Sequence, residues 1–252
     1  MSSRHPTYPH PTIAEAVCDI HFRLPETKAW KPSFAGELFK HIQDEYPEME
    51  PVVEVGLQME SGPAGTGTKI LPQSQKVRFK HRTRPLVLQL SDHSFSISTL
   101  PPYQGWEVMR TDALAAWRHA EEVLQPVVIR RLGVRYINQF EKETVQDHPG
   151  DWFAANDYIP HVLLCSEPGF LARVHVHLSV DNVLIITLGD TNPEPEREKG
   201  TIIFDIDRIL DKELSSEQGE LLQALDRLHD DVWSIFSSAK GEKMDRLLNG
   251  RL

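Results

Sequence analysis

The sequence predicts an α+β fold, in which two long amphipathic helices pack on antiparallel sheet. Three observations favour this class. Short runs of alternating apolar and polar residues follow one another with short turns, as in an antiparallel meander. Two long stretches instead carry apolar side chains at helical spacing. The elements run strand, helix, meander, long helix, and then strand, hairpin, strand, long helix, which is typical of α+β proteins.

One domain is predicted over residues 13–252, after a flexible, proline-rich terminal segment at 1–12. A chain of 252 residues can bury a sizeable core, either as one large domain or as two small halves. The order of the elements allows two pseudo-repeated halves, 13–101 and 102–252, although the sequence holds no detectable repeat.

The first half is predicted to begin with a strand, because apolar residues occupy every second position from Ala14 to Phe22. A helix follows Pro32, since proline is tolerated in the first turn of a helix. Three strands joined by short turns then form a meander, which Pro101 and Pro102 end. These elements cover residues 13–24, 33–45, 52–59, 76–82, 86–90 and 94–100.

The second half is predicted to hold both long helices. Pro126 ends the first of them, and a serine precedes the second as a plausible cap. Asp181 and Asn182 predict a two-residue hairpin turn, because both residue types tolerate positive φ. These elements are a helix at 103–125, strands at 127–140, 170–180, 183–188 and 201–206, and a helix at 217–237.

The composition is that of an acidic, soluble protein, with 27 Lys and Arg, 37 Asp and Glu and a formal net charge of -10. Cys18 and Cys165 stand in apolar runs, a usage that fits a reducing compartment. No secretory signal is recognised, and no apolar run approaches the ~20 residues of a membrane helix. We expect a cytoplasmic protein without membrane association, and no sequence motif indicates a cofactor or a catalytic residue.

Positive charge is concentrated in one predicted strand. No acidic residue occurs between Glu60 and Asp92, a window that contains six basic residues. Five of them, the basic ladder, alternate with other residue types, so one strand face is basic. The ladder is either a solvated edge strand or a docking face for an acidic protein segment or a nucleic-acid backbone. Its members are Lys76, Arg78, Lys80, Arg82 and Arg84.

A second polar group interrupts the apolar strand at 127–140, where Arg131, Arg135 and Asn138 surround Gly133. Arginine in a half-buried strand needs a partner, because an unpaired buried charge costs several kcal/mol. We expect Glu15 to be that partner, with Asp205 as the second choice. The group is either an internal ion pair or a pocket in which the arginines bind a carboxylate or phosphate.

Two short pairs offer a weak indication of a metal site. His175 and His177 share one strand face, and Asp205 and Asp207 share a face of another strand. If the two faces met, they would supply nitrogen and oxygen ligands suited to zinc, manganese or iron. Such pairs also arise by chance on exposed strands, so no metal is predicted.

Four runs and several single residues carry a resemblance. The runs are PTIAEAVCDIHF at 11–22, VLQLSDHSFSI at 87–97, IRRLGVRYIN at 129–138 and IFDID at 203–207, together with Pro102, Tyr103, Trp106, Leu228 and His229. They resemble a family of uncharacterised prokaryotic proteins of about this length, which is distributed sporadically among bacteria and archaea. The resemblance implies no activity. Sporadic occurrence implies horizontal transfer, which is typical of defence, toxin–antitoxin and mobile-element genes.

These observations favour a non-catalytic interaction or regulatory protein that binds a protein partner, as an antitoxin-like or phage-defence accessory component. One alternative is nucleic-acid binding through the basic strand at 76–84. A second is a small-molecule or metal pocket near Glu15, Arg131, Arg135, His175 and Asp205. The sequence leaves the oligomeric state open, a homodimer included.

Overall fold

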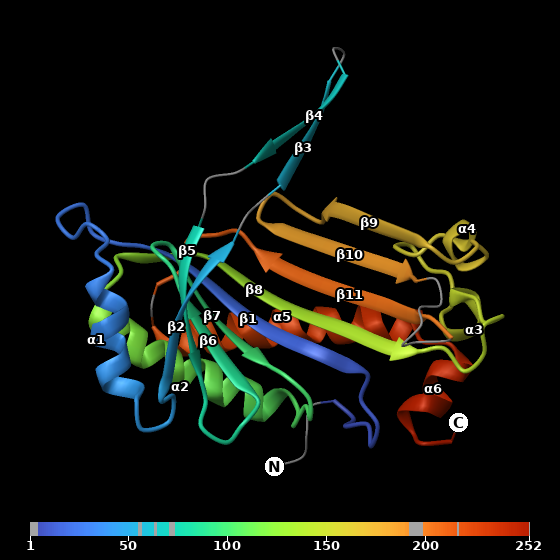
Figure 1. Ribbon diagram of the computed structural model, residues 1–252, viewed down its shortest axis with the longest axis horizontal. Coiled ribbons are helices and arrows are strands. Elements are labelled where there is room, and N and C mark those ends of the chain that lie inside the picture. The colour runs from blue at the N-terminus through green and yellow to red at the C-terminus, as the bar shows by residue number, and fades with distance from the viewer. Residues whose placement is uncertain are drawn as a thin grey trace.

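The computed structural model describes residues 5–54, 57–62, 65–70, 74–191, 199–215 and 217–251, and the side chains of 53–75 lie outside this description. Within these residues the protein is an α+β structure with a nine-stranded antiparallel sheet, a two-stranded sheet and six helices (Figure 1). The predicted fold class and the antiparallel sheet are confirmed. No described helix combines the length and the apolar character needed to cross a bilayer.

The chain up to residue 124 supplies five strands of the large sheet, a separate hairpin and two helices. The hairpin, which stands out from the large sheet in Figure 1, overlaps only the end of the strand predicted at 52–59, whose first residues belong to a strand of the large sheet. The elements are β1 (Ile13–Arg23), α1 (Ser33–Ile42), β2 (Glu48–Glu54), β3 (Leu57–Gly62), β4 (Gly65–Ile70), β5 (Ser74–Lys80), β6 (Leu86–Leu90), β7 (Ser94–Thr99) and α2 (Trp106–Leu124).

The chain from residue 128 onward supplies the other four strands of the large sheet and four helices. Two of these helices are short, and α5 is the longest described helix with 22 residues. The elements are β8 (Val128–Glu141), α3 (Pro149–Trp152), α4 (His161–Leu164), β9 (Phe170–His177), β10 (Asn182–Asp190), β11 (Thr201–Leu210), α5 (Gln218–Ala239) and α6 (Glu242–Leu248).

The order of the large sheet is β2-β5-β6-β7-β1-β8-β11-β10-β9. The first strands of the two halves, β1 and β8, therefore lie side by side at its centre, where Cys18 is opposite Val134. A meander extends outward on each side. The predicted meander of the first half is confirmed by the pairing of β5 with β6 and of β6 with β7.

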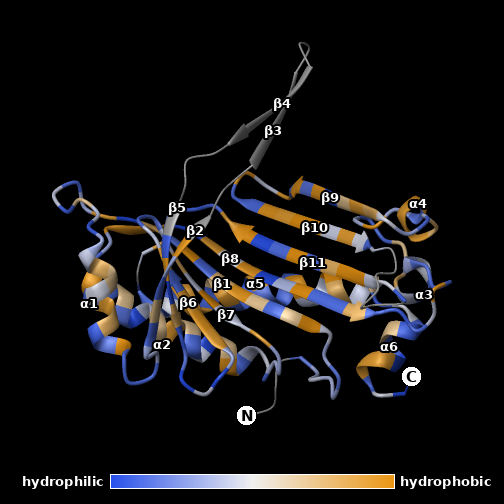
Figure 2. Ribbon diagram, viewed as in Figure 1, coloured by the Kyte–Doolittle hydropathy of each residue, from blue (hydrophilic) through white to orange (hydrophobic). Residues whose placement is uncertain are grey.

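Helices α2 and α5 lie behind the sheet in Figure 1, and the core fills the space between these two layers. Alternate strand residues point into that core, as the alternating colours along the strands of Figure 2 illustrate. On β1, Ala16, Cys18, Ile20 and Phe22 are buried in this way. The opposite side of the large sheet, which faces away from α2 and α5, is called the open face below.

The start of α2 differs from the predicted helix at 103–125. The helix begins at Trp106, because Gly105 before it has φ 103° and ψ 163°, a conformation that is nearly restricted to glycine. At its other end, Gln125 adopts a left-handed conformation with φ 50°, and Pro126 follows. The described helix therefore has 19 residues.

Candidate functional site

Most of the basic ladder is paired within the chain. Because β2 pairs with β5, Glu50 lies opposite Arg78 and Glu48 lies opposite Lys80. Arg78 donates to Glu50 Oε1 at 3.2 Å, and Lys80 Nζ lies 3.1 Å from Glu50 Oε2 and 3.7 Å from Glu48 Oε2. These lysine and arginine contacts lower the pKa of Glu50. Strand β5 is therefore not an edge strand, and β2 balances the charges of Arg78 and Lys80.

Two ladder residues lie beyond the end of β5, which stops at Lys80 rather than at the predicted residue 82. Arg84 forms a bidentate pair with Asp112 of α2, with N–O distances of 2.9 and 2.5 Å. Hydrogen bonding to Asp112 raises the pKa of Arg84. Arg82 is exposed in the connection to β6, whereas Lys76 is half-buried on β5. The five residues thus do not form one continuous basic strand.

The polar group at the sheet centre is divided between the two faces. Arg135 and Asp205 form a bidentate pair on the open face, with both N–O distances 2.8 Å. Asn138 belongs to the core side, where it accepts from Thr12 Oγ1 at 2.9 Å and donates to the Phe204 carbonyl at 3.2 Å. The second predicted partner, Asp205, is therefore the one that the structure pairs with Arg135, and Glu15 makes no described hydrogen bond to it.

Gly133 lies on β8 between Arg131 and Arg135, and charged side chains surround it on the open face. A Cβ atom at Gly133 would lie 3.5 Å from Asp19 Cβ and 4.0 Å from Asp207 Oδ1, so carboxylates flank this position from both neighbouring strands. Burial, with the nearby carboxylates, raises the pKa of Asp207 to about 6, although both arginines act in the opposite direction. Arg131 Nε is buried and has no hydrogen-bond partner among the described residues.

The predicted metal candidates are not brought together. His175 and His177 stand exposed on β9 with their rings stacked at 5.0 Å, whereas Asp205 and Asp207 belong to β11. Strand β10 lies between β9 and β11, which separates them by roughly 9.5 Å. Within the described residues, the groups whose ligand atoms lie within 4.8 Å of one another are His5, His229 and Asp230, and His41, His119 and Glu122.

A cavity of about 90 Å³ lies between α2, α5 and the large sheet, under the segment that precedes β1. The sequence did not indicate it. Most of its wall is apolar or aromatic, and side chains from both halves of the chain contribute. Its lining includes His5, Tyr8, Thr12, Tyr103, Trp106, Tyr136, Ile206, His229, Val232, Trp233 and Phe236.

Two tyrosines of the cavity lining form a hydrogen-bonded pair. Tyr103 and Tyr136 are hydrogen-bonded through their hydroxyl oxygens at 2.6 Å, and the Tyr136 hydroxyl also donates to Met109 Sδ at 3.9 Å. Burial raises the pKa of both tyrosines well above the usual range, so both hydroxyls stay protonated at neutral pH. Because Tyr136 donates to Met109, Tyr103 donates to Tyr136, and the pair offers uncharged acceptor oxygens within a mainly apolar wall.

A stacked pair forms another wall. The rings of Trp106 and His229 are 4.3 Å apart and nearly parallel, at 4°. Trp106 donates from Nε1 to Asp226 at 2.8 Å, and Arg110 donates to both oxygens of the same carboxylate at 2.7 and 2.8 Å. This network fixes the start of α2 against α5, and with it the ring of His229.

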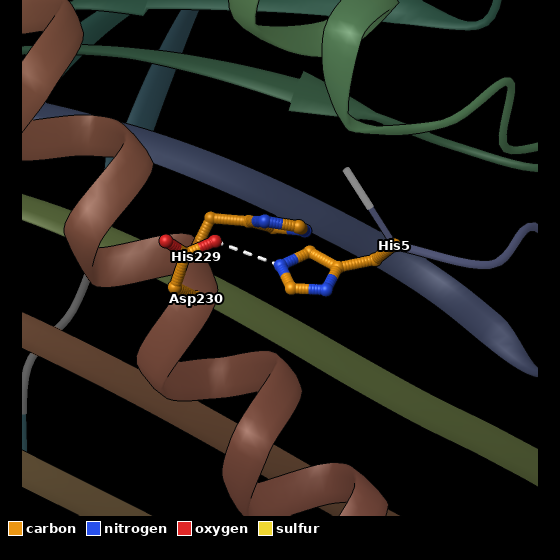
Figure 3. A group of neighbouring side chains, drawn as sticks. All are labelled: His5, His229 and Asp230. Atoms are coloured by element: carbon orange, nitrogen blue, oxygen red, sulfur yellow. Dashed lines mark hydrogen bonds and ion pairs between the residues drawn. The ribbon is translucent and has the colours of Figure 1, made fainter. Parts of the chain in front are cut away.

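The segment 5–12, which the sequence predicted to be flexible, lies over the cavity. The backbone N–H of His10 donates to the Leu248 carbonyl at 3.1 Å, and Lys240 donates to the Tyr8 hydroxyl at 3.1 Å. His5 stacks on Trp233 at 5.0 Å and lies beside His229 and Asp230 (Figure 3). This segment is therefore the cover of the cavity.

Sequence reasoning missed the cavity because its residues look like core residues. Trp106 stands at helical spacing with other apolar residues, and His229 lies among leucines of the same helix. The available indication was the polar ring of His229 on an apolar helix face. The polar hydroxyl of Tyr136 among the apolar residues of β8 is a similar indication. A scan against models of known protein families finds no match for this chain, and a search of curated proteins finds no similar protein.

Proposed function

We propose that this protein binds a small, uncharged and mainly apolar ligand in the cavity between α2, α5 and the large sheet. The observation that carries the proposal is the hydrogen-bonded hydroxyl pair of Tyr103 and Tyr136, two residues that line a space with largely apolar walls. Concave, mostly apolar spaces with a few convergent polar groups are the usual form of small-molecule sites.

Size and polarity define the class of ligand. The cavity of about 90 Å³ is smaller than the ~150 Å³ that holds benzene in an engineered protein core. A ring-sized ligand therefore requires the segment 5–12 to shift, whereas a ligand of a few heavy atoms does not. An ionised group would lose its hydration without gaining a counter-charge from the tyrosines, so the ligand is neutral. One hydroxyl or amide group on it would bond to the tyrosine pair.

The resemblance described above adds support. If the chain belongs to that family, two of the runs and two of the single residues that carry the likeness meet at one place, because the cavity lining includes Thr12, Tyr136, Tyr103 and His229. Residues that mark a family and converge on one cavity favour a shared ligand rather than a shared surface.

Phenol is a suitable probe, since it combines an apolar ring with one hydroxyl. In an NMR titration, we expect chemical-shift changes at the cavity residues and saturable binding. Tyr103→Phe removes one hydroxyl and should weaken phenol binding about fivefold, the equivalent of a hydrogen bond of about 1 kcal/mol.

Tyr46→Phe is the matched control, because Tyr46 is also buried but does not line the cavity. It should leave the affinity unchanged. Equal affinities for the wild type and Tyr103→Phe, or shifts confined to residues outside the cavity, would refute the proposal.

A second candidate function is docking of an acidic protein segment on the open face, in keeping with the expected protein partner. The specific observation is Arg131, a half-buried arginine on that face whose buried Nε has no described hydrogen bond. The internal pairing of Arg78, Lys80 and Arg84 argues against nucleic-acid binding through the ladder. A role in defence or as an antitoxin stays a prediction that no described contact supports.

We also infer that the two halves are pseudo-repeats. Support comes from the sheet order, in which β7-β6-β5 extend from β1 as β11-β10-β9 extend from β8, and from the equivalent places of α2 and α5. The boundary then falls at 125–127 rather than at 101–102.

Retention on immobilised polyglutamate tests the docking candidate. Arg131→Ala should elute at lower salt than the wild type, because one positive charge of the docking face is lost. Arg130→Ala, at the exposed neighbouring position, is the control and should change retention little. Identical elution of the Arg131→Ala variant and the wild type would remove this candidate.

A further inference from the structure

His5, His229 and Asp230 form a compact group of metal-ligand type at the edge of the cavity (Figure 3). His5 belongs to the segment before β1, whereas His229 and Asp230 are consecutive residues of α5. His5 Nε2 lies 2.7 Å from Asp230 Oδ1, and one ligand atom from each of the three side chains lies within 4.8 Å of the others.

We propose that these three residues bind a divalent zinc ion, which fastens the N-terminal segment over the cavity. Two imidazole nitrogens and one carboxylate oxygen are a common zinc ligand set, and three protein ligands leave a fourth position for water or another ligand. The ion would connect residue 5 to residues 229 and 230, which are otherwise far apart in the chain.

The required adjustment is small. Ligand atoms around a tetrahedral zinc ion lie about 3.4 Å apart when the metal–ligand bonds are about 2.1 Å long. The present separations of up to 4.8 Å must therefore shorten by up to about 1.4 Å, and the 2.7 Å between His5 Nε2 and Asp230 Oδ1 must lengthen by about 0.7 Å. His5 can supply this movement, because it lies outside any helix or strand and its ring is half-buried. The imidazole of His229 is already held in place by its stack on Trp106.

Burial makes the group of His5, His229 and Asp230 a better zinc site than the second group of possible metal ligands. His229 is buried, with 6% of its surface exposed, so its ring is oriented before a metal arrives. In the second group, His41 and Glu122 are exposed on α1 and α2, and ordering them would cost side-chain entropy. His5 and His229 also line the cavity, so the ion would lie beside any molecule bound there.

The test is a zinc titration of the full chain, prepared without an affinity tag and treated with a chelator. We expect one equivalent of zinc to bind with higher affinity than any other. His5→Ala and Asp230→Asn should each weaken this binding at least tenfold, because even residues that only support a ligand change affinity 10- to 100-fold. Neither change disturbs a buried side chain, so both variants should fold.

His119→Ala is the matched control, since it removes the central histidine of the second group. It should leave the affinity of the first equivalent unchanged. No zinc binding by the wild type, full affinity in His5→Ala and Asp230→Asn, or a loss of affinity in His119→Ala would each overturn the proposal.

A second measurement reports on fastening of the segment. Zinc should slow hydrogen exchange of the His10 amide, which donates to Leu248, in the wild type and not in Asp230→Asn. Unchanged exchange with zinc bound would overturn the fastening. Phenol binding is measured on the chelator-treated protein, so the cavity proposal stands or fails independently of the metal.

Discussion

The carboxyl group of Asp207 lies at the centre of the open face, close to two arginines and to the carboxylates of Asp19 and Asp205. Burial is the largest influence on it and raises its pKa to about 6, from an ordinary value of 3.8. The folded protein therefore binds a proton at Asp207 more tightly than the unfolded chain does. This residue makes stability depend on pH in the direction opposite to that of an ion-paired carboxylate.

Between about pH 4 and pH 6 the folded state holds the proton that the unfolded state has released, so this contribution to stability decreases as pH rises. Above pH 6 the full cost of the buried charge is present. Asp207→Asn removes the charge and should be more stable than the wild type at pH 7, with the difference disappearing near pH 4. Urea denaturation across this range measures it. The exposed Asp211→Asn is the control, and a stability gain there as large as at Asp207 would contradict the explanation.

At the scale of elements, one glycine is needed to begin a helix and another lies inside a helix where alanine would be the better residue. Gly105 precedes α2 with φ 103°, and a Cβ atom there would meet nothing within 4 Å. Gly36 lies inside α1, and a Cβ atom there would likewise meet nothing within 4 Å. An added methyl group is not crowded at either site, and the two sites differ only in backbone conformation. Any difference between the two alanine variants therefore comes from the backbone conformation.

We expect Gly105→Ala to destabilise the protein by about 1–3 kcal/mol, because alanine rarely adopts that conformation. Gly36→Ala should stabilise it by about 0.5–1 kcal/mol, since alanine is the better helix residue. Chemical denaturation of both variants measures whether the free energy of unfolding falls or rises relative to the wild type. A gain in stability for Gly105→Ala would show that α2 does not depend on its glycine.

The elements also show what a local pattern can predict. The alternation from Ala14 to Phe22 predicted β1 within one residue at its end, because both faces of a strand are decided by residues near in sequence. The basic ladder was read from the same kind of pattern, but its partners Glu48 and Glu50 lie 28 to 32 residues earlier. Pairing of β2 with β5 is a contact between distant segments, and alternation does not encode it.

In the whole molecule, Lys142 and Asp190 connect the ends of β8 and β10. Their side chains are fully buried, with 0% exposure each, and Lys142 Nζ lies 2.8 Å from Asp190 Oδ1. Asp190 Oδ2 has no hydrogen-bond partner among the described residues. A buried pair of this kind holds two strands in place on either side of β11, and its loss leaves a charge in the core.

Asp190→Ala should destabilise the protein by about 3–5 kcal/mol, because Lys142 would remain buried and unpaired. The double variant Lys142→Met, Asp190→Leu should recover most of that loss, since apolar residues of similar size need no counter-charge. Thermal unfolding of the three proteins gives the comparison. If the double variant is as unstable as Asp190→Ala, lost packing rather than the unpaired charge explains the effect.

The sequence by itself determined the α+β class, the antiparallel meander and the approximate extent of the main elements, because these depend on apolar periodicity over short distances. Only the tertiary structure decided which charges are paired and which polar rings meet. Tyr103, Tyr136 and His229 lie up to 126 residues apart in the chain, and the packing of α2 and α5 on one face of the sheet brings them to one cavity. Contacts between side chains so far apart in the chain depend on how the helices and strands pack, and a pattern of neighbouring residues does not predict that packing.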